Sequence, residues 1–506
     1  MISTLRWILD GLYLIPLTVL TIYSVHRYWE VILYRLYRRR QPARAGTFDI
    51  LPTVTVQLPL YNERYVAARV IEAAGRLDYP RDRLQIQVLD DSTDESADIA
   101  RRACARLRQA GVDVEYLHRQ ERTGFKAGAL AAGLASAKGE FIAIFDADFV
   151  PQPDMLRRVI HYFTDPKVGC IQTRWEHLNR RQSLLTRCQA VFLDGHFIIE
   201  HGARSRSGRF INFNGTGGVW RASAVRDAGG WQHDTLTEDM DLSYRAQLQG
   251  WKIIFLPEVV SPAELPPEII AFKQQQHRWT KGSVQTGIKL LPALLGARLP
   301  LRVKIEAWFH LSSGIVYPMA VLLSVLLLPT FFLGGPGVLA PKSPVLALII
   351  MALLTVLTFS AGTFYVLAQK ELGQSFWRGA LLVPLLMAVG MGISLANSLA
   401  VWEGFIGRQS EFIRTPKYGI AGDAPRHQWK SRAGAFRGKL HWLPWVEIAL
   451  GLYLLACIVI AVVCQRAVLC VPFLLVFMFG YLYVGCLSLY AQWLARRSEP
   501  LPALAA

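Results

Sequence analysis

The chain has 506 residues, of which 52% are hydrophobic, and it carries a formal net charge of +17. Its composition is too apolar for an ordinary soluble enzyme and too rich in charge between positions 40 and 300 for a pure membrane bundle, so a soluble domain joined to membrane helices is expected. Arginines and lysines concentrate beside apolar runs, as the positive-inside rule predicts, and no nucleic-acid-binding signature is present. We therefore expect no nucleic acid among the partners.

The first apolar run covers residues 8–25. A cleaved signal peptide would carry its basic residues before this run, but here five arginines follow it, between positions 27 and 40. This arrangement predicts a retained membrane span whose C-terminal side faces the cytoplasm.

Alternating strands and helices are predicted after this span. Buried strands are indicated at 53–60, 84–92 and 140–150, and helices at 64–76 and 94–110. Strands separated by helices form a mostly parallel sheet, and such sheets bind ligands beyond the carboxyl ends of their strands. Two acidic motifs, "LDDSTD" and "FDADF", fall at such ends.

The second acidic motif places Asp146 and Asp148 directly after an apolar run. The i, i+2 spacing puts both carboxylates on one side of an extended chain, where a divalent cation can neutralise them. Capping of a helix N-terminus is the alternative role. In the first motif, one aspartate of the pair Asp90 and Asp91 is expected to bind a nucleotide base or ribose, while Ser92 or Asp94 caps the next helix.

Lys126 lies in a glycine-containing loop that opens an alanine-rich helix. A lysine there can meet a diphosphate with help from the helix N-terminus, although a solvated lysine is the alternative. Further on, Glu238, Asp239 and Asp241 begin another helical pattern. Capping and the helix dipole explain one or two of these acids, and the third is a candidate catalytic base.

The stretch "FKQQQHRWTKG" at 272–282 precedes a long apolar run. One interpretation is an interfacial segment, with Arg278 and Lys281 on lipid headgroups and Trp279 in the aromatic belt. A binding site beside the membrane is the other interpretation.

Later apolar runs that are long enough to cross a bilayer lie at 308–333, 345–368, 443–464 and 468–493. A further run at 380–407 is flanked by two basic loops that should both face the cytoplasm, and it is interrupted by Asn397 and Glu403. We expect this run to lie in the interface or to re-enter, with a sixth full crossing as the alternative.

Seven motifs carry a resemblance to a known family: "QLPLYNER", "VLDDSTD", "RTGFKAGAL", "FDADF", "NFNGTGGVWR", "TEDMDL" and "QQHRW". Together, over about residues 50–285, they resemble the processive inverting glycosyltransferases of family two, and most of all the cellulose-synthase-like group that makes β-mannan and xyloglucan-type glucan backbones. A further stretch, "FIRTPK", is similar to the gating loop of cellulose synthases through Phe412, Thr415 and Lys417. Arg414 stands where the family has valine.

The resemblance implies a role for each motif. Donor binding would fall to Tyr61, Asn62, Glu63, Asp90, Asp91, Lys126, Asp146, Gln275 and Arg278. Asp146 and Asp148 would hold a metal ion, Mg²⁺ or Mn²⁺. Asp239, beside Glu238, would be the general base, and Trp279 would be a stacking platform for the terminal sugar of the acceptor.

The implied fold is an α/β domain of the glycosyltransferase A type, with a mixed, mostly parallel sheet, inserted in an α-helical membrane domain of about five spans plus interfacial helices. The expected domains are an N-terminal transmembrane helix (1–40), a cytoplasmic glycosyltransferase domain (41–290), and interfacial helices with a transmembrane channel region (291–506). The gating loop would lie near 408–442.

The implied function is polymerisation of a β-linked polysaccharide, β-1,4 by resemblance, and its export across a membrane, expected to be a bacterial inner membrane. The partners would be a nucleotide-sugar donor, the growing polysaccharide, the lipid bilayer and, if present, accessory export proteins. The donor stays open between UDP-glucose and GDP-mannose. The alternatives are a non-processive transferase acting on a lipid, and a transporter or scaffold with a degenerate transferase domain.

Overall fold

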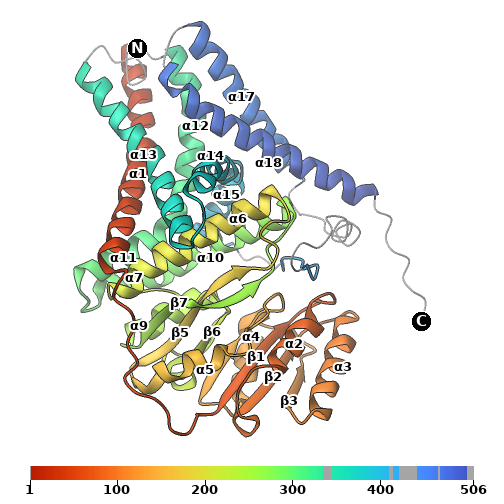
Figure 1. Cartoon of the computed structure of the whole chain (residues 1–506). Helices are drawn as coiled ribbons and strands as arrows, with labels where there is room; N and C mark the ends of the chain where they lie inside the picture. The colour runs from red at the N-terminus through yellow and green to blue at the C-terminus, as the bar shows by residue number, and fades with distance from the viewer. Residues whose placement is uncertain (1, 334–343, 409–413, 421–440, 465–467, 498–506) are drawn as a thin grey trace.

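The computed structural model describes residues 2–333, 344–408, 414–420, 441–464 and 468–497. A seven-stranded sheet with its flanking helices forms one end of the molecule, and a bundle of long helices forms the other (Figure 1). Between them lies a layer that contains α6 (Leu184–Gly195), α10 (Ile269–Gly296) and α11 (Leu301–Ser312).

The sheet has the strand order β3-β2-β1-β4-β6-β5-β7. Its strands are β1 (Val54–Leu60), β2 (Leu84–Asp90), β3 (Asp113–His118), β4 (Phe141–Ile144), β5 (Val168–His177), β6 (Gly218–Arg221) and β7 (Lys252–Ala263). Only β6 runs antiparallel to its neighbours, so the sheet is mixed and mostly parallel, as the sequence predicts.

Both faces of the central strands are buried, which explains their continuous apolar character. On one face, Val56 and its neighbours pack under α2 (Ala67–Gly75) and α3 (Ser96–Gln109). On the other face, Ile142 and Ile144 pack with α4 (Phe125–Ser136) and α9 (Glu238–Leu248). Strand β4 is shorter than the predicted 140–150 because the chain leaves the sheet after Ile144.

The polar side chains inside these strands are paired across the sheet. Gln57 Nε2 donates to Gln87 Oε1 at 3.0 Å, and Thr55 Oγ1 donates to Gln85 Oε1 at 2.8 Å. Buried amides without such partners would destabilise the fold, so these pairs also help to set the register of β1 against β2.

The helical end of the molecule is built from α1 (Ile2–Tyr37), α12 (Val316–Leu333), α13 (Pro344–Glu371), α14 (Phe376–Gly392), α15 (Ser394–Phe405), α17 (Leu443–Val463) and α18 (Val471–Arg497). Within the described residues, helices long and apolar enough to cross a bilayer cover Leu301–Pro329, Met351–Glu371, Leu443–Val463 and Val471–Ala495. These four match four of the predicted spans in position. The first predicted span, 8–25, lies inside α1.

The predicted interrupted run at 380–407 folds as the bent pair α14 and α15. The two helices meet at an angle of 46°, and the pair has the composition of either a broken span or a re-entrant loop. By length and composition, the described residues therefore contain four or five apolar crossings, and the segment 8–25 in α1 is not among them. The path of residues 380–407 through a bilayer stays a prediction.

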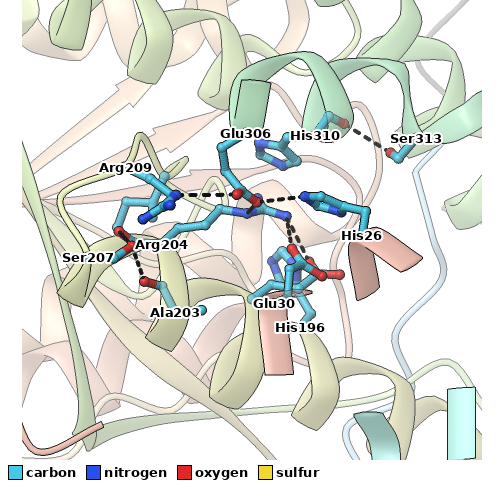
Figure 2. Close-up of polar contacts among 12 residues, drawn as sticks. His26, Glu30, His196, Ala203, Arg204, Ser207, Arg209, Glu306, His310 and Ser313 are labelled. Carbon is cyan, nitrogen blue, oxygen red and sulfur yellow. Dashed lines mark hydrogen bonds and ion pairs between the residues drawn. The ribbon is translucent and has the colours of Figure 1, made fainter. Parts of the chain in front are cut away.

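The N-terminal helix is joined to the half of the molecule that contains the sheet by a buried ion network (Figure 2). Arg204, in α7 (Gly202–Arg206), lies 3.1 Å from Glu30 of α1 and 3.4 Å from Glu306 of α11. Glu306 also meets His26 at 3.1 Å and Arg209 at 3.4 Å. His26, Glu30 and Glu306 lie close enough together to hold a cation, but the two guanidinium groups already neutralise these carboxylates, so the network works as a structural junction.

Close helix packing at Gly480 gives a test of the membrane half. A Cβ atom at this position of α18 would overlap the backbone carbonyl oxygen of Ala388 in α14. Gly480→Ala should lower the free energy of unfolding by about 1–3 kcal/mol, because neither backbone can give way. Thermal unfolding in detergent measures the effect.

Gly390→Ala is the matched control, because nothing lies within 4 Å of a Cβ atom there. This helical substitution should leave stability unchanged or slightly increased. Equal stability of the two variants would show that α14 and α18 do not pack as closely as described.

Candidate active site

One pocket collects residues from the carboxyl end of the sheet, from α9 and α10, and from the segment at 414–417. Its lining includes Tyr61, Glu63, Asp91, Lys126, Asp146, Asp148, Glu238, Asp239, Gln275, Arg278, Trp279, Thr415 and Lys417. Most of the residues singled out from the sequence therefore lie together, although they are spread over more than 350 positions. Among the predicted site residues, Asn62 and Asp90 do not line the pocket, and Phe412 lies outside the described residues.

Asp146 and Asp148 follow β4 in a turn at the carboxyl end of the sheet. The backbone N–H of Asp146 donates to Thr216 Oγ1 at 2.8 Å, which fixes the turn. Lys126 Nζ lies 2.5 Å from Asp146 Oδ1, and Lys417 Nζ lies 2.5 Å from Asp148 Oδ2. Each carboxylate is thus neutralised by a lysine from another element, and the lysine on Asp148 comes from 269 positions further along the chain.

Lys126 stands in the first turn of α4, directly after two residues with positive φ, Gly124 and Phe125. Its ammonium group donates to the carbonyl oxygen of Gly215 at 2.9 Å and lies 4.0 Å from Glu238. Burial by itself would lower the pKa of Lys126, but the nearby carboxylates, Asp146 foremost, raise it. The side chain therefore stays charged and can bind an anion.

Asp239 lies at the N-terminus of α9, next to Glu238. Burial and the neighbouring charge of Glu238 raise the pKa of Asp239 to about 7, although Lys126 acts in the opposite direction. A carboxyl group with a pKa near neutrality suits a general base. Asp241 points elsewhere, since it pairs with Arg245 at 2.6 Å and with Lys289 at 2.9 Å, and its role is structural.

Gln275, Arg278 and Trp279 face the pocket from α10. The pKa of Arg278 is lowered overall, because the effect of burial is larger than that of the nearby charges of Glu238 and three aspartates, which raise it. The Trp279 ring lies 6.3 Å from the ring of Trp175, at an interplanar angle of 54°. The two indoles give the pocket an aromatic wall that suits the face of a sugar.

Trp175 and His177 line the pocket from β5, and sequence reasoning missed both. They belong to the stretch "QTRWEH", which contains neither a pair of acidic residues nor a glycine that would mark it as part of a binding site. His177 Nε2 lies 3.4 Å from Asp194 Oδ1, and both side chains are buried. An aromatic residue in a strand is equally typical of the core, so no local signal distinguished Trp175 as a pocket residue.

The two aspartates of "LDDSTD" have different environments. Asp91 lines the pocket and is held by Arg119, whose guanidinium donates to its two oxygens at 2.7 and 2.6 Å. Asp90 is fully buried and accepts from Tyr116 Oη at 2.7 Å and from the backbone N–H of Ser92. Adjacent strand residues point to opposite sides, so only Asp91 can face a ligand.

Asn62 does not line the pocket but stabilises the loop that carries Tyr61 and Glu63. It has a φ of +53°, and its Oδ1 accepts from the backbone N–H of Thr93 at 2.8 Å. Its neighbours Tyr61 and Glu63 line the pocket instead. The Arg122 guanidinium lies 3.4 Å from the centroid of the Tyr61 ring, so this side of the pocket combines a flat aromatic face with a cation.

The segment 414–420, here called the gating-loop segment, is docked on the pocket. Arg414 lies 2.9 Å from Glu63 Oε2, so this residue, which departs from the family pattern, has a definite partner. Burial raises the pKa of Glu63 to about 8, against the opposing charge of Arg414. Glu264 holds the other end, because its two oxygens accept from the backbone N–H groups of Tyr418 and Ile420 at 2.8 and 2.9 Å.

Comparison with known proteins agrees with this geometry. Residues 52–282 match the model of a family described as "Glycosyltransferase like family 2". Glucomannan 4-beta-mannosyltransferase 7 of Arabidopsis thaliana is 32% identical over 485 residues, which cover 90% of this chain and 83% of that protein. Glucomannan 4-beta-mannosyltransferase 1 of Cyamopsis tetragonoloba is 35% identical over 419 residues, which cover 80% and 76%.

Among solved structures, the mannosyltransferase PcManGT from Pyrobaculum calidifontis, in complex with GDP-Man and Mn²⁺, superposes with a TM-score of 0.55. The match covers 79% of this chain and all of that one at 20% identity, so it supports the fold alone. The relatives and the shared motifs identify the family as well as the fold. This chain belongs to glycosyltransferase family 2 and is a glycosyltransferase, as its motifs predict.

Proposed function

We propose that this enzyme polymerises a β-1,4-linked, mannose-containing polysaccharide from GDP-mannose and passes the product across the membrane in which it is embedded. The observation that carries the proposal is one pocket that joins a carboxylate pair, a candidate base, cationic side chains that can bind an anion, and an aromatic wall. The names of the relatives, all glucomannan 4-beta-mannosyltransferases, support the sugar and the linkage.

The reaction needs one base and strong stabilisation of the leaving group. A hydroxyl of the acceptor attacks the anomeric carbon of the donor, Asp239 takes the hydroxyl proton, and the bond from that carbon to the diphosphate oxygen breaks. The electron pair of this bond leaves with the nucleoside diphosphate. Lys126 and Arg278 are placed to stabilise its charge, so no second acid is required.

Asp146 and Asp148 fit a divalent cation. They are two hard oxygen donors on one turn, in the same pocket as Lys126 and Arg278, and such cations use one or two carboxylates plus substrate phosphates. When bound, Mg²⁺ or Mn²⁺ would neutralise the diphosphate as it departs. PcManGT binds Mn²⁺ and GDP-Man in its solved complex. The lysines now on these carboxylates would move to the phosphates.

The acceptor chain is placed by the aromatic wall of Trp279 and Trp175. Sugar rings stack on indole through their apolar faces while their hydroxyls stay solvated. The wall lies on α10 and β5, next to the helices long enough to cross a bilayer. We propose that the catalytic domain faces the cytoplasm and that the membrane is a bacterial inner membrane, with the product leaving between the helices.

The donor and product are tested with protein purified in lipid with Mg²⁺ or Mn²⁺. Labelled GDP-mannose and UDP-glucose are supplied separately, and products are digested with linkage-specific glycanases. High-molecular-weight material from GDP-mannose, degraded by a β-1,4-mannanase, is expected. A single sugar on a lipid would favour the non-processive alternative, and polymer from UDP-glucose alone would overturn the proposed donor.

The pH dependence follows from the pKa of Asp239. The base works only when it is ionised, so kcat/KM should rise about tenfold per pH unit up to about pH 7 and level off above it. Asp239→Asn should abolish transfer at every pH while nucleotide binding, measured by calorimetry, stays nearly intact. An active Asp239→Asn variant would remove the base assignment.

The close approach of the backbone at Gly215 to the Asp239 carboxylate can be tested by substitution. A Cβ atom there would lie 2.8 Å from Asp239 Oδ2. Gly215→Ala should therefore displace the carboxylate and lower kcat at least tenfold, which corresponds to about 1.4 kcal/mol.

Gly230→Ala is the control for backbone strain alone. Gly230 has a similar φ of +72°, against +80° at Gly215, but nothing lies within 4 Å of its Cβ position. Steady-state kinetics should show little change for this variant. Equal losses in both variants would mean that strain, and not contact with Asp239, causes the effect.

A further inference from the structure

Helix α10 carries two buried lysines that the reaction does not use. Lys273 and Lys281 lie on either side of the stretch from Gln275 to Trp279. The residue Lys281 is fully buried, and Lys273 is nearly so. Lysine is among the residues least often buried, and it needs a partner when it is.

Each lysine pairs with a glutamate from a different helix of the membrane half. Lys273 Nζ lies 2.5 Å from Glu447 Oε1 on α17, with Ser488 Oγ of α18 at 3.5 Å. Lys281 Nζ lies 3.0 Å from Glu403 Oε2 on α15. Two ion pairs thus tie one helix to two separate elements, one on each side of the pocket residues.

Close backbone packing surrounds both pairs. A Cβ atom at Gly404, the residue after Glu403, would lie 2.9 Å from Val284 of α10. A Cβ atom at Gly485 of α18 would lie 3.3 Å from the Cβ atom of Glu447. The first contact holds α15 close to α10, and the second holds α18 close to α17, which carries the partner of Lys273.

Helix α10 also bears on the segment that carries the catalytic base. A Cβ atom at Gly282 would lie 2.6 Å from Thr237 Cγ2 and 2.9 Å from the Thr237 backbone nitrogen. Thr237 directly precedes Glu238 and Asp239, and the backbone N–H of Leu236 donates to Gln285 Oε1 of α10 at 3.0 Å. A displacement of α10 would move the aromatic wall and the base together.

Stability alone does not require these ion pairs, because a buried salt bridge is often no more stabilising than an apolar pair of similar volume. What an ion pair adds is a fixed partner and a fixed position. We propose that Lys273 and Lys281 are positioning residues that hold α10 in register with α15 and α17, so that Arg278, Trp279 and Asp239 keep their places relative to the membrane helices. This inference rests on the proposed function, since it concerns transfer by the same pocket.

The test uses the full chain in lipid and the variants Lys281→Met, Glu403→Gln and the double variant Lys281→Met/Glu403→Gln. Lys281→Met removes the cation nearest to Glu403, which keeps His277 at 3.6 Å and Arg408 at 3.8 Å, and Glu403→Gln removes the carboxylate that lies 3.0 Å from Lys281. Each single variant should lower both the melting temperature and kcat, the latter at least tenfold. The double variant should recover the melting temperature but not kcat. KM for the nucleotide sugar should rise as well, because Arg278, a donor contact, moves with α10.

Recovery of kcat together with the melting temperature in the double variant would overturn the inference, since the pair would then serve stability alone. Lys281→Arg keeps the charge and should retain more activity than Lys281→Met. Lys252→Met is the matched control, because Lys252 forms an exposed ion pair with Asp165 at 2.9 Å on the far edge of the sheet. A loss at Lys252 equal to that at Lys281 would also count against the inference.

A second readout does not depend on the product. Thr237 Oγ1 lies 3.2 Å from Thr286 Oγ1 of α10, so cysteines at these two positions should form a disulfide that mass spectrometry detects. Lys281→Met in this background should slow its formation at least fivefold, and an unchanged rate would overturn the inference. If the parent protein makes no polymer from either donor, the proposed function fails, while this rate still decides whether Lys281 positions α10.

Discussion

The pocket depends on the neutralisation of clustered carboxylates, which are partly or fully buried. Glu63, Asp146, Asp148, Glu238 and Asp239 lie in one partly enclosed space, where uncompensated negative charge would be very costly. The compensating cations, Lys126, Arg278, Arg414 and Lys417, come from α4, from α10 and from the gating-loop segment. Electrostatics therefore holds together segments that are far apart in sequence, and the same cations are the groups that an incoming diphosphate would attract.

Much of this site could be predicted because its acidic residues directly follow the strands of the sheet. Asp146 and Asp148 stand directly after an apolar strand, and the structure places them at the carboxyl edge of a mostly parallel sheet. Asp90 could not be separated from Asp91 by composition alone, since the answer lies in which side of β2 each faces. Trp175 could not be found either, because its position depends on how β5 pairs with β6 and β7.

In the membrane half, too, some features could be predicted from the sequence and others could not. Hydropathy located four apolar helices and the irregular run at 380–407, because both are properties of a continuous stretch of chain. The break itself lies at Ile393, and the polar residues Asn397 and Glu403 that indicated it lie inside α15. The pairing of Lys273 with Glu447 joins residues 174 positions apart, and no local pattern announces it. The predicted domain boundary at 290 falls inside α10, since this helix continues to Gly296 and belongs to both halves. A boundary predicted from composition therefore falls within a helix that packs against both the catalytic half and the membrane half.

The junction around Arg204 has a consequence for how the molecule could be divided. Its guanidinium belongs to the catalytic half, but two of its carboxylate partners, Glu30 and Glu306, belong to helices outside that half. Cutting out the catalytic half would remove two of the three carboxylates that pair with Arg204, leave Glu200 at 3.5 Å, and expose the guanidinium to water. The helices α1 and α11 therefore cover and neutralise a charged surface of the domain that performs the chemistry.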